Sequence, residues 1–181
     1  AGVERASLAS IAPVTDDDIG TGIEVPGSNP MSPEERSVYA NNVSPGWFAT
    51  VGARVLTGRD FSAGDRAGAP LVVVVNEALA QRFFTGQSPV GRTVRFGAIE
   101  GQRIVQREAE IVGVVEDRVY RNVRAPAPPT LYQAFAQAGT PSGAYLFARS
   151  ARGAHAALGP RITSAIAKLD PGLALTVRSM R

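Results

Sequence analysis

Short apolar runs, many of them rich in β-branched residues, alternate with Gly- and Pro-containing segments along most of the chain. The clearest run, residues 71–75, is continuously apolar, which predicts a strand buried on both faces. Asn76 follows it in the position of a helix N-cap. Leu79 and Phe83 then form an apolar stripe at i, i+4, with Phe84 beside it. The pattern predicts a buried strand that leads directly into an amphipathic helix.

A second, shorter helix is predicted upstream of this strand. Ser44 is a favourable N-cap residue, and Pro45 suits the first helical position. Trp47 and Phe48 then fall on one side of the helix, and Gly52 supplies a left-handed stop. The aromatic residues of both predicted helices are expected to pack in the core rather than to line an apolar ligand pocket, because helical spacing already accounts for their burial.

The other strands are shorter or less regular. Residues 20–37 are rich in Gly, Pro, Ser and Glu and predict a long connection that carries a short edge strand. Loops are expected at 62–69 and at 97–101. The predicted strands cover residues 3–11, 22–25, 37–43, 71–75, 93–96, 109–115, 131–135, 144–149 and 173–177.

The last third of the chain changes character. Leu158, Ile162 and Ile166 recur at helical spacing between two predicted strands. Pro160 requires this helix either to begin close to it or to have a distorted first turn. A stiff Pro-rich stretch separates the resulting strand–helix–strand unit from the short buried strands of the middle. The sequence therefore predicts an α+β fold with two lobes of mixed α/β structure.

The order of several motifs is more specific than any one of them. The motifs are Val-Ser-Pro-Gly-aromatic-Phe at 43–48, Gly-Arg-Asp-Phe at 58–61, Val-Val-Asn-Glu-Ala-Leu-Ala at 74–80, Pro-Val-Gly-Arg at 89–92 and Ile-Val-Gly-Val-Val at 111–115. In this order and spacing, they resemble the MacB-like periplasmic core domain of FtsX/MacB-type ABC-transporter permeases. The Pro-rich segment 124–132 and Leu-Asp-Pro at 169–171 are similar to the permease group common in acidobacteria.

The resemblance implies a porter-like βαβ lobe at 1–14 and 128–181, with a β-rich, sabre-like lobe inserted at 15–127. The porter-like lobe would lack its upstream strand and helix, so the chain is expected to be a portion of a longer permease. The implied location is periplasmic, on the extracytoplasmic face of the inner membrane, as part of an integral membrane protein. The implied partners are the permease's own transmembrane helices and nucleotide-binding domain, together with a periplasmic adaptor protein.

The function implied by the resemblance is a relay of ATP-driven conformational change, within an efflux or export permease, to a periplasmic partner or substrate. ATP chemistry is expected in another domain or subunit, because the chain has no Gly-x-x-x-x-Gly-Lys-[Ser/Thr] motif. The alternative is a module that captures a ligand or a lipoprotein cargo directly. A filled core between the lobes favours the relay, whereas a continuous apolar groove there favours capture.

Composition narrows the chemistry further. The 181 residues include no cysteine and a single histidine, His155, which removes the material for thiol catalysis, Cys-based metal sites and a His-based triad. The net charge of +3 is small, so no nucleic-acid partner is expected. No apolar run reaches the roughly 18 residues of a membrane-spanning helix. We therefore expect no catalytic, cofactor-binding or metal-binding residue, and no enzymatic activity.

One segment after the predicted strand at 109–115 is a candidate partner or hinge surface. It combines basic and aromatic side chains with a stiff proline run, and its alternative interpretation is a solvated loop rim. The residues of this candidate surface are Arg118, Tyr120, Arg121, Arg124, Pro126, Pro128 and Pro129.

The carboxylate residues give weaker signals. Residues 16–18 are consecutive aspartates without the alternating spacing of a calcium loop, so they are expected to be solvated. Asp60 and Asp65 are expected to cap turns and to form local ion pairs with neighbouring arginines. Glu116 and Asp117 are expected to point apart, because adjacent residues at a strand end lie on opposite faces.

Overall fold

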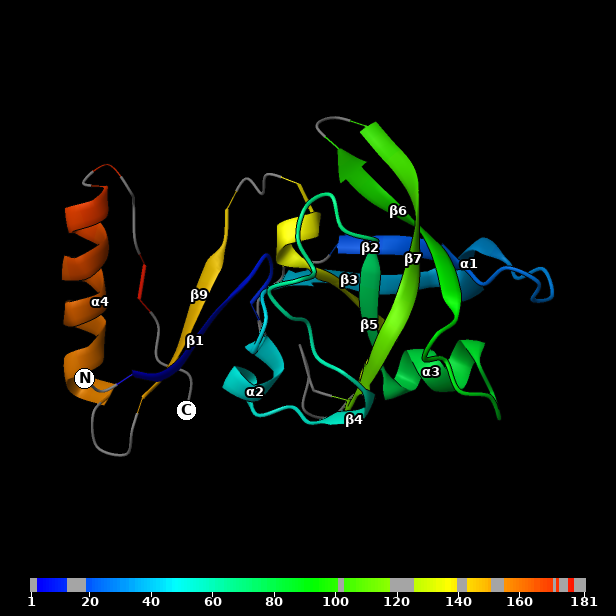
Figure 1. The fold of residues 1–181 in the computed structure, drawn as a ribbon, viewed down its shortest axis with the longest axis horizontal. Helices are drawn as coiled ribbons and strands as arrows, with labels where there is room; N and C mark the ends of the chain where they lie inside the picture. The colour runs from blue at the N-terminus through cyan, green and yellow to red at the C-terminus, as the bar shows by residue number, and fades with distance from the viewer. Residues whose placement is uncertain are drawn as a thin grey trace.

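A closed ring of six strands makes up the larger part of the fold. Around the ring, neighbouring strands follow the order β2-β6-β7-β5-β8-β3, and β3 pairs again with β2. The β5–β7 and β3–β8 pairs are parallel, and the other four pairs are antiparallel. The strands are β2 (Ile19–Glu24), β3 (Ser37–Val43), β5 (Val72–Asn76), β6 (Thr93–Glu100), β7 (Arg103–Val115) and β8 (Thr130–Ala134), as Figure 1 shows.

The computed structural model of the protein describes residues 3–12, 19–100, 103–117, 126–139, 143–150, 155–170, 172 and 176–177. In this part of the chain, helices combine with one large sheet in a mixed α/β fold of the α+β class, which confirms the predicted fold class. No helix in these ranges is long and apolar enough to cross a membrane.

Every strand of the ring contributes an apolar side chain to one buried cluster. Leu79 of α3 (Glu77–Phe83) and Phe84, which follows this helix, belong to the same cluster. Burial of a large apolar side chain contributes about 1.5–3 kcal/mol, so this shared cluster holds the ring and α3 together. The strand residues in the cluster include Ile23, Val38, Val73, Val94, Ile111 and Leu131.

Strand β5 separates this cluster from a second one. Val73 and Val75 belong to the cluster of the ring, whereas Val72 and Val74 pack in a cluster around α2 (Trp47–Val51). All residues of β5 are buried, which confirms the prediction of a strand buried on both faces. The alternation of side chains along a strand therefore lets one segment stabilise two cores.

An arm extends from one side of the ring (Figure 1). It consists of β1 (Val3–Ala9), β9 (Tyr145–Ser150) and α4 (His155–Leu169). Strand β1 pairs with β9 along its length, but it pairs with β3 of the ring only at Ala9↔Val43. The sheet is thus continuous from ring to arm through a single registered pair.

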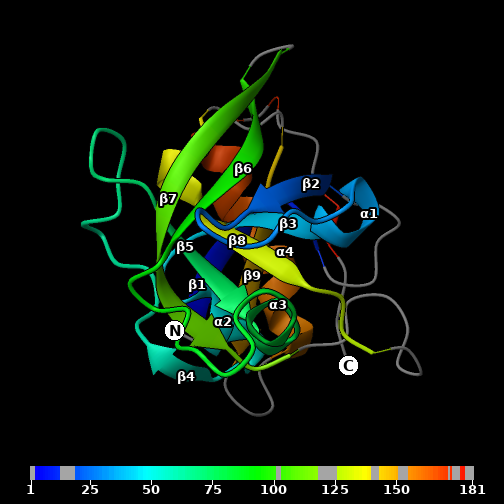
Figure 2. The same cartoon turned by 90° about the vertical axis from the view of Figure 1, so that its right-hand side faces the viewer.

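Three smaller elements complete the described part. The single-turn helix α1 (Pro33–Arg36) begins with a capping box between Ser32 and Glu35. Strand β4 (Val55–Gly58) pairs with β7 beside the ring, and the 3₁₀ helix η1 (Phe135–Gln137) follows β8. In Figure 2, α1 lies beside β3, and α3 lies at the opposite end of the ring from the β6–β7 hairpin.

Two strand predictions were wrong. Strand β2 is not an edge strand in a long connection, because it pairs with both β3 and β6; fully buried Ile23 anchors it in the ring. The loop expected at 97–101 is largely strand, because β6 continues through Gly97 to Glu100 in register with β7. Glycine weakens a strand without forbidding it, and the long hairpin ladder supplies the backbone partners.

The start of α2 also differs from the prediction. Ser44 does not cap α2, because its Oγ accepts a hydrogen bond from Leu8 N at 2.8 Å. The helix begins instead after Gly46, whose φ of 77° interrupts the backbone before the first turn. Gly52, with φ of 78°, ends the helix as predicted. Helix α4 begins at His155 with Pro160 inside it, so of the two predicted alternatives the start close to Pro160 was wrong.

The division into two lobes stays a prediction. Strand β8 lies just after the predicted boundary at residue 128, yet it pairs with β3 and β5 within the ring. The last predicted strand, at 173–177, falls mostly outside the described residues. The arm and the ring are therefore the units that the described structure defines.

Candidate functional site

Three of the sequence motifs meet where the arm joins the ring. Helix α2, from the Val-Ser-Pro-Gly-aromatic-Phe motif, packs against β1 and β9 of the arm. Its other contacts are with residues of the Gly-Arg-Asp-Phe turn and of the ring. The Ile-Val-Gly-Val-Val motif lies in β7, next to β4 and that turn. We call this region the junction.

Five aromatic side chains form the centre of the junction, and we refer to them as the aromatic junction. The indole centroid of Trp47 lies 5.7 Å from the aromatic centroid of Tyr132, a residue of strand β8. It lies 6.1 Å from the aromatic centroid of Phe147, a residue of the arm. Phe48 stacks on Phe61 at 6.2 Å and meets Tyr132 edge-on at 5.0 Å. Such pairs contribute about 0.5–1.5 kcal/mol each beyond their burial. Trp47 therefore contacts both structural units.

Backbone contacts reinforce the junction over a short segment of β1. Ser10 N donates to Asn42 O and Ser44 N donates to Leu8 O, both at 2.9 Å. Buried Asn41 exchanges two hydrogen bonds with the backbone of Ile11, at 3.0 and 3.1 Å. The attachment thus involves few residues of the chain, and their polar groups form hydrogen bonds across it.

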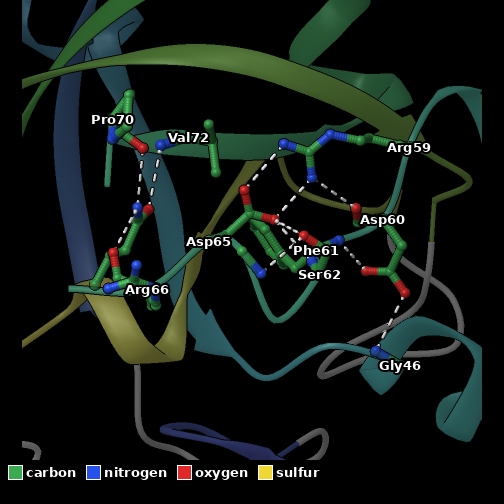
Figure 3. A network of polar contacts seen from close by, with 11 residues as sticks. Gly46, Arg59, Asp60, Phe61, Ser62, Asp65, Arg66, Pro70 and Val72 are labelled. Carbon is green, nitrogen blue, oxygen red and sulfur yellow. Dashed lines mark hydrogen bonds and ion pairs between the residues drawn. The ribbon is translucent and has the colours of Figure 1, made fainter. Parts of the chain in front are cut away.

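The Gly-Arg-Asp-Phe turn is fixed by an ion pair (Figure 3). Arg59 donates from Nη1 and Nη2 to the two carboxylate oxygens of Asp65, at 2.7 and 2.9 Å. Asp65 also accepts from Ser62 N at 2.7 Å. The hydrogen bond from Arg59 holds the pKa of Asp65 below its ordinary value, although burial opposes this shift. The prediction of a local ion pair at Asp65 is confirmed.

Asp60 links the turn to the start of α2. Its carboxylate accepts hydrogen bonds from Phe61 N at 2.6 Å and from Gly46 N at 3.3 Å (Figure 3). Burial raises the pKa of Asp60, and the two backbone donors lower it by less. Asp60 thus caps its own turn, as predicted, and also satisfies a backbone donor of the residue before α2.

Two glycines let β4 and β7 approach each other closely. A Cβ atom on Gly58 would lie 2.2 Å from Val112 O, and one on Gly113 would lie 2.2 Å from Arg59 O. Arg59 N donates to Val112 O at 2.9 Å in the same place. These contacts explain a glycine in each of the two motifs.

Gln137 forms hydrogen bonds with the loop that follows the Gly-Arg-Asp-Phe turn. No sequence pattern predicted this role. Its Nε2 donates to Pro70 O at 2.9 Å, and its Oε1 accepts from Val72 N at 3.2 Å. Its carbonyl oxygen accepts from Arg107 Nη1 at 2.7 Å. Buried Gln137 therefore connects η1, the loop before β5 and the β7 strand. A single glutamine between two alanines has no recognisable pattern, so only the fold reveals this role.

The described part of the candidate partner surface is fastened to α3. Asn76 Nδ2 donates to Pro128 O at 2.9 Å, while its Oδ1 accepts from Leu79 N and Thr130 N, at 3.1 and 2.8 Å. Pro129 O accepts from Tyr39 N at 2.9 Å. The N-cap prediction for Asn76 is therefore confirmed. Pro126 is exposed.

The remaining residues of that surface are not described, so its role stays a prediction. Arg118, Tyr120, Arg121 and Arg124 lie outside the described residues, as do the aspartates at 16–18. Just before this segment, Asp117 accepts from Ala78 N at 3.0 Å.

Among the described residues, the carboxylate and aromatic side chains of this region form structural contacts. Glu116 pairs with Arg54 at 2.8 Å, whereas Asp117 caps α3, which confirms that these two carboxylates point apart. Among the described residues, no group of three or more His, Asp or Glu side chains is placed to hold a metal ion. Trp47, Phe48 and Phe84 are buried in the two hydrophobic clusters, which confirms their packing role.

Comparison with known proteins places the chain among transporter domains. A family model described as the MacB-like periplasmic core domain matches residues 3–176. No curated protein sequence matches the chain.

Three solved structures share its fold. The periplasmic region of MacB from Actinobacillus actinomycetemcomitans is 17% identical with a TM-score of 0.60, over 93% of this chain and 68% of that one. A permease domain from Porphyromonas gingivalis is 12% identical with a TM-score of 0.57, over 93% and 71%. The extracellular domain of the transporter YknZ from Gram-positive bacteria is 16% identical with a TM-score of 0.52, over 90% and 70%.

Proposed function

The chain belongs to the family of MacB-like periplasmic core domains, and from this premise we propose that it relays ATP-driven conformational change to a periplasmic partner or substrate. As a periplasmic domain of an ABC-transporter permease, it works with the membrane part of that permease and with an ATPase. The family is one of transporter domains and not of enzymes.

The proposal rests on the way in which the junction attaches the arm to the ring. The arm is attached to the ring through one registered strand pair and through α2, whose Trp47 contacts both units. A relay needs an element that is coupled to both ends and that has two arrangements. A short attachment beside a closely packed helix supplies such an element, because the arm can rotate while its contacts with α2 redistribute.

The packing of the junction favours a relay over direct capture of cargo. Trp47 and Phe48 are 2% and 1% exposed, and Tyr132 is 2% exposed. These side chains fill the space between arm and ring around α2, where a capture module would need an open apolar groove. Within this proposal, the surface at 118–129 contacts a periplasmic adaptor protein, and the arm belongs to the porter-like lobe.

A disulfide across the junction tests the relay. Asn42 Nδ2 lies 3.2 Å from Ser10 Oγ, so cysteines at these two positions face each other across the attachment. The chain has no cysteine of its own, which leaves the engineered pair unambiguous. In the intact permease, oxidation of Ser10→Cys with Asn42→Cys should reduce ATP turnover by about tenfold, which corresponds to 1.4 kcal/mol, and reduction should restore it.

The control is a disulfide that stays within the arm. Arg5 and Arg149 are exposed partners in the β1–β9 ladder, so Arg5→Cys with Arg149→Cys crosslinks the arm without spanning the junction. This pair should leave ATP turnover unchanged. Full turnover with the junction locked would show that the relay is wrong, and direct capture of cargo would then be the better account.

A further inference from the structure

Strands β2 and β6 pair over only part of their lengths. Their registered pairs are Ile23↔Phe96 and Glu24↔Arg95. Residues 19–22 of β2 stay paired with β3 on their other side, whereas β6 continues to Glu100 with β7. The β6–β7 hairpin rises out of the ring away from β2 in both Figure 1 and Figure 2. A gap therefore opens between the two strands, and it narrows toward Ile23.

Beyond Phe96, the β6 side of this gap has no registered partner strand among the described residues. Gly97 O accepts a hydrogen bond from Thr21 Oγ1 at 2.8 Å, so the carbonyl of Gly97 points toward β2. The N–H and C=O groups of an antiparallel strand change sides at each residue, and Ile99 therefore directs its own pair into the gap as well. Ile99 is registered with Ile104 of β7, and it has no registered partner in β2.

A cavity of about 410 Å³ lies along the gap. Its walls are mainly apolar and include Phe96, Ala98 and Leu131. A Cβ atom on Gly20 or Gly22 would meet nothing within 4 Å, so no side chain packs on the face of β2 at these two positions. At the tip of the hairpin, Ile99 and Ile104 are 61% and 79% exposed.

We propose that the gap between β2 and β6 binds an extended polypeptide segment of a partner protein by strand addition. The main chain of the segment pairs with β6 at Ile99, and an alternate apolar side chain enters the cavity. Main-chain bonds supply affinity and side-chain pockets supply specificity in this mode of recognition. The proposal is independent of the relay.

The shape of the gap selects a single extended chain. Its apex is flanked by β2 on one side and β6 on the other, and neighbouring strands in a sheet lie about 4.8 Å apart. One strand fits between two diverging strands, whereas the folded edge of a second copy carries its own neighbouring strand. A lipid chain would fill the cavity but would leave the backbone groups of Ile99 without partners.

The test uses the 181-residue chain labelled with ¹⁵N and an acetylated seven-residue peptide of alternating valine and threonine. At about 1 mM peptide, a concentration that detects weak binding, the amide signals of Gly20, Gly22 and Ile99 should shift. A peptide of the same sequence with N-methylated alternate amides should not bind, because it keeps the side chains but loses the main-chain donors.

Two proline variants separate the β6 edge that faces the gap from the rest of the hairpin. Ile99→Pro removes the N–H that points into the gap, so it should weaken peptide binding about tenfold or more. Ile104→Pro removes the N–H on the far side of the same registered pair and should leave binding unchanged, while both variants keep the β6–β7 ladder.

Several results would overturn the proposal. They are the absence of any shift with the alternating peptide, equal binding of the N-methylated peptide, and equal binding by Ile99→Pro. Concentration-dependent dimers that Ile99→Pro dissociates would identify a second copy as the occupant. Binding of phosphatidylcholine vesicles in competition with the peptide would identify a lipid chain instead.

Discussion

At the scale of single residues, the glycines of two motifs are explained by one close backbone approach. Gly58 and Gly113 are registered partners in β4 and β7, and each faces a carbonyl oxygen of the other segment. A Cβ at either position would approach that oxygen to 2.2 Å, closer than any real contact. The backbone, and not a flexible side chain, would have to move to relieve the overlap.

Gly113→Ala should therefore destabilise the protein by about 3 kcal/mol or more, as expected for overpacking against rigid backbone. Denaturant unfolding monitored by circular dichroism measures the change. Gly20→Ala is the matched control, because a Cβ there meets nothing within 4 Å, and it should be neutral or slightly stabilising. Equal stability of Gly113→Ala and the wild type would contradict the close approach.

Asp65 gives a pH-dependent prediction. Its hydrogen bonds with Arg59 hold the pKa of Asp65 below the ordinary value of 3.8. The interaction therefore stabilises the fold above pH 3.8, and this stability is lost as the pH falls through the lower folded-state pKa. At neutral pH, Asp65→Asn should lower the free energy of unfolding by about 1–3 kcal/mol.

The difference between Asp65→Asn and the wild type should shrink as the pH falls below 3.8, because the wild-type carboxyl then becomes neutral as well. Urea unfolding across this range measures both proteins. A difference that stays constant with pH would show that the ion pair does not contribute.

At the scale of elements, the end of α3 differs by one residue from the predicted apolar stripe, because Phe84 is more buried than Phe83. The helix ends at Phe83, and Phe84 adopts φ −130° and turns into the cluster of the ring. Phe84 is 5% exposed, whereas Phe83 is only partly buried and packs beside Arg82. The i, i+4 pattern with Leu79 identified the helix face, but it could not show where the chain leaves the helix.

Phe84→Ala should destabilise the protein by about 3–5 kcal/mol, the range for emptying a buried aromatic site. Phe83→Ala is the control on the neighbouring position and should cost less than half as much, because this side chain keeps part of its solvent contact. Thermal and denaturant unfolding of both variants provide the measurement. Equal losses in the two variants would contradict the different burial of the two rings.

Local patterns predicted those elements whose partners lie nearby in sequence. The valine run of β5 and the cap at Asn76 follow from burial and from hydrogen bonding within a few residues, and both are confirmed. Ser44 shows the limit, because its hydroxyl is used by Leu8 N, a partner 36 residues away. Long-range partners of this kind cannot be read from spacing along the chain.

At the scale of the whole molecule, the ring and its junction depend on contacts between distant segments. The family resemblance predicted the fold class, and three of the motifs contain residues that form the junction. The closure of the ring by β2 was not predicted. The glycines of residues 20–22 are typical of a connection, and their partners in β3 belong to another predicted strand. The contacts of Tyr132 with α2 and of Gln137 with the loop before β5 were not predicted for the same reason.

The narrow attachment of the arm makes its movement the central claim of this account. Strands β1 and β9 are registered along β1, yet Ala9↔Val43 is the one registered strand pair that joins them to the ring, supported by hydrogen bonds of residues 8–11. Rotation about this short attachment would involve few residues, and the aromatic junction would couple it to α2. We expect the arm and the ring to move as two rigid units when the nucleotide state of the permease changes.

Spin-label distances in the intact permease test this claim most directly. Cysteine-attached labels replace Arg149 in the arm and Gln81 on α3, both exposed, and double electron–electron resonance records their separation with and without ATP. The account predicts a shifted distance distribution for this pair. Labels at Gln81 and Gln106, which lies in β7 of the ring, should keep one distribution in both states. An unchanged distance between Arg149 and Gln81 would contradict the relay.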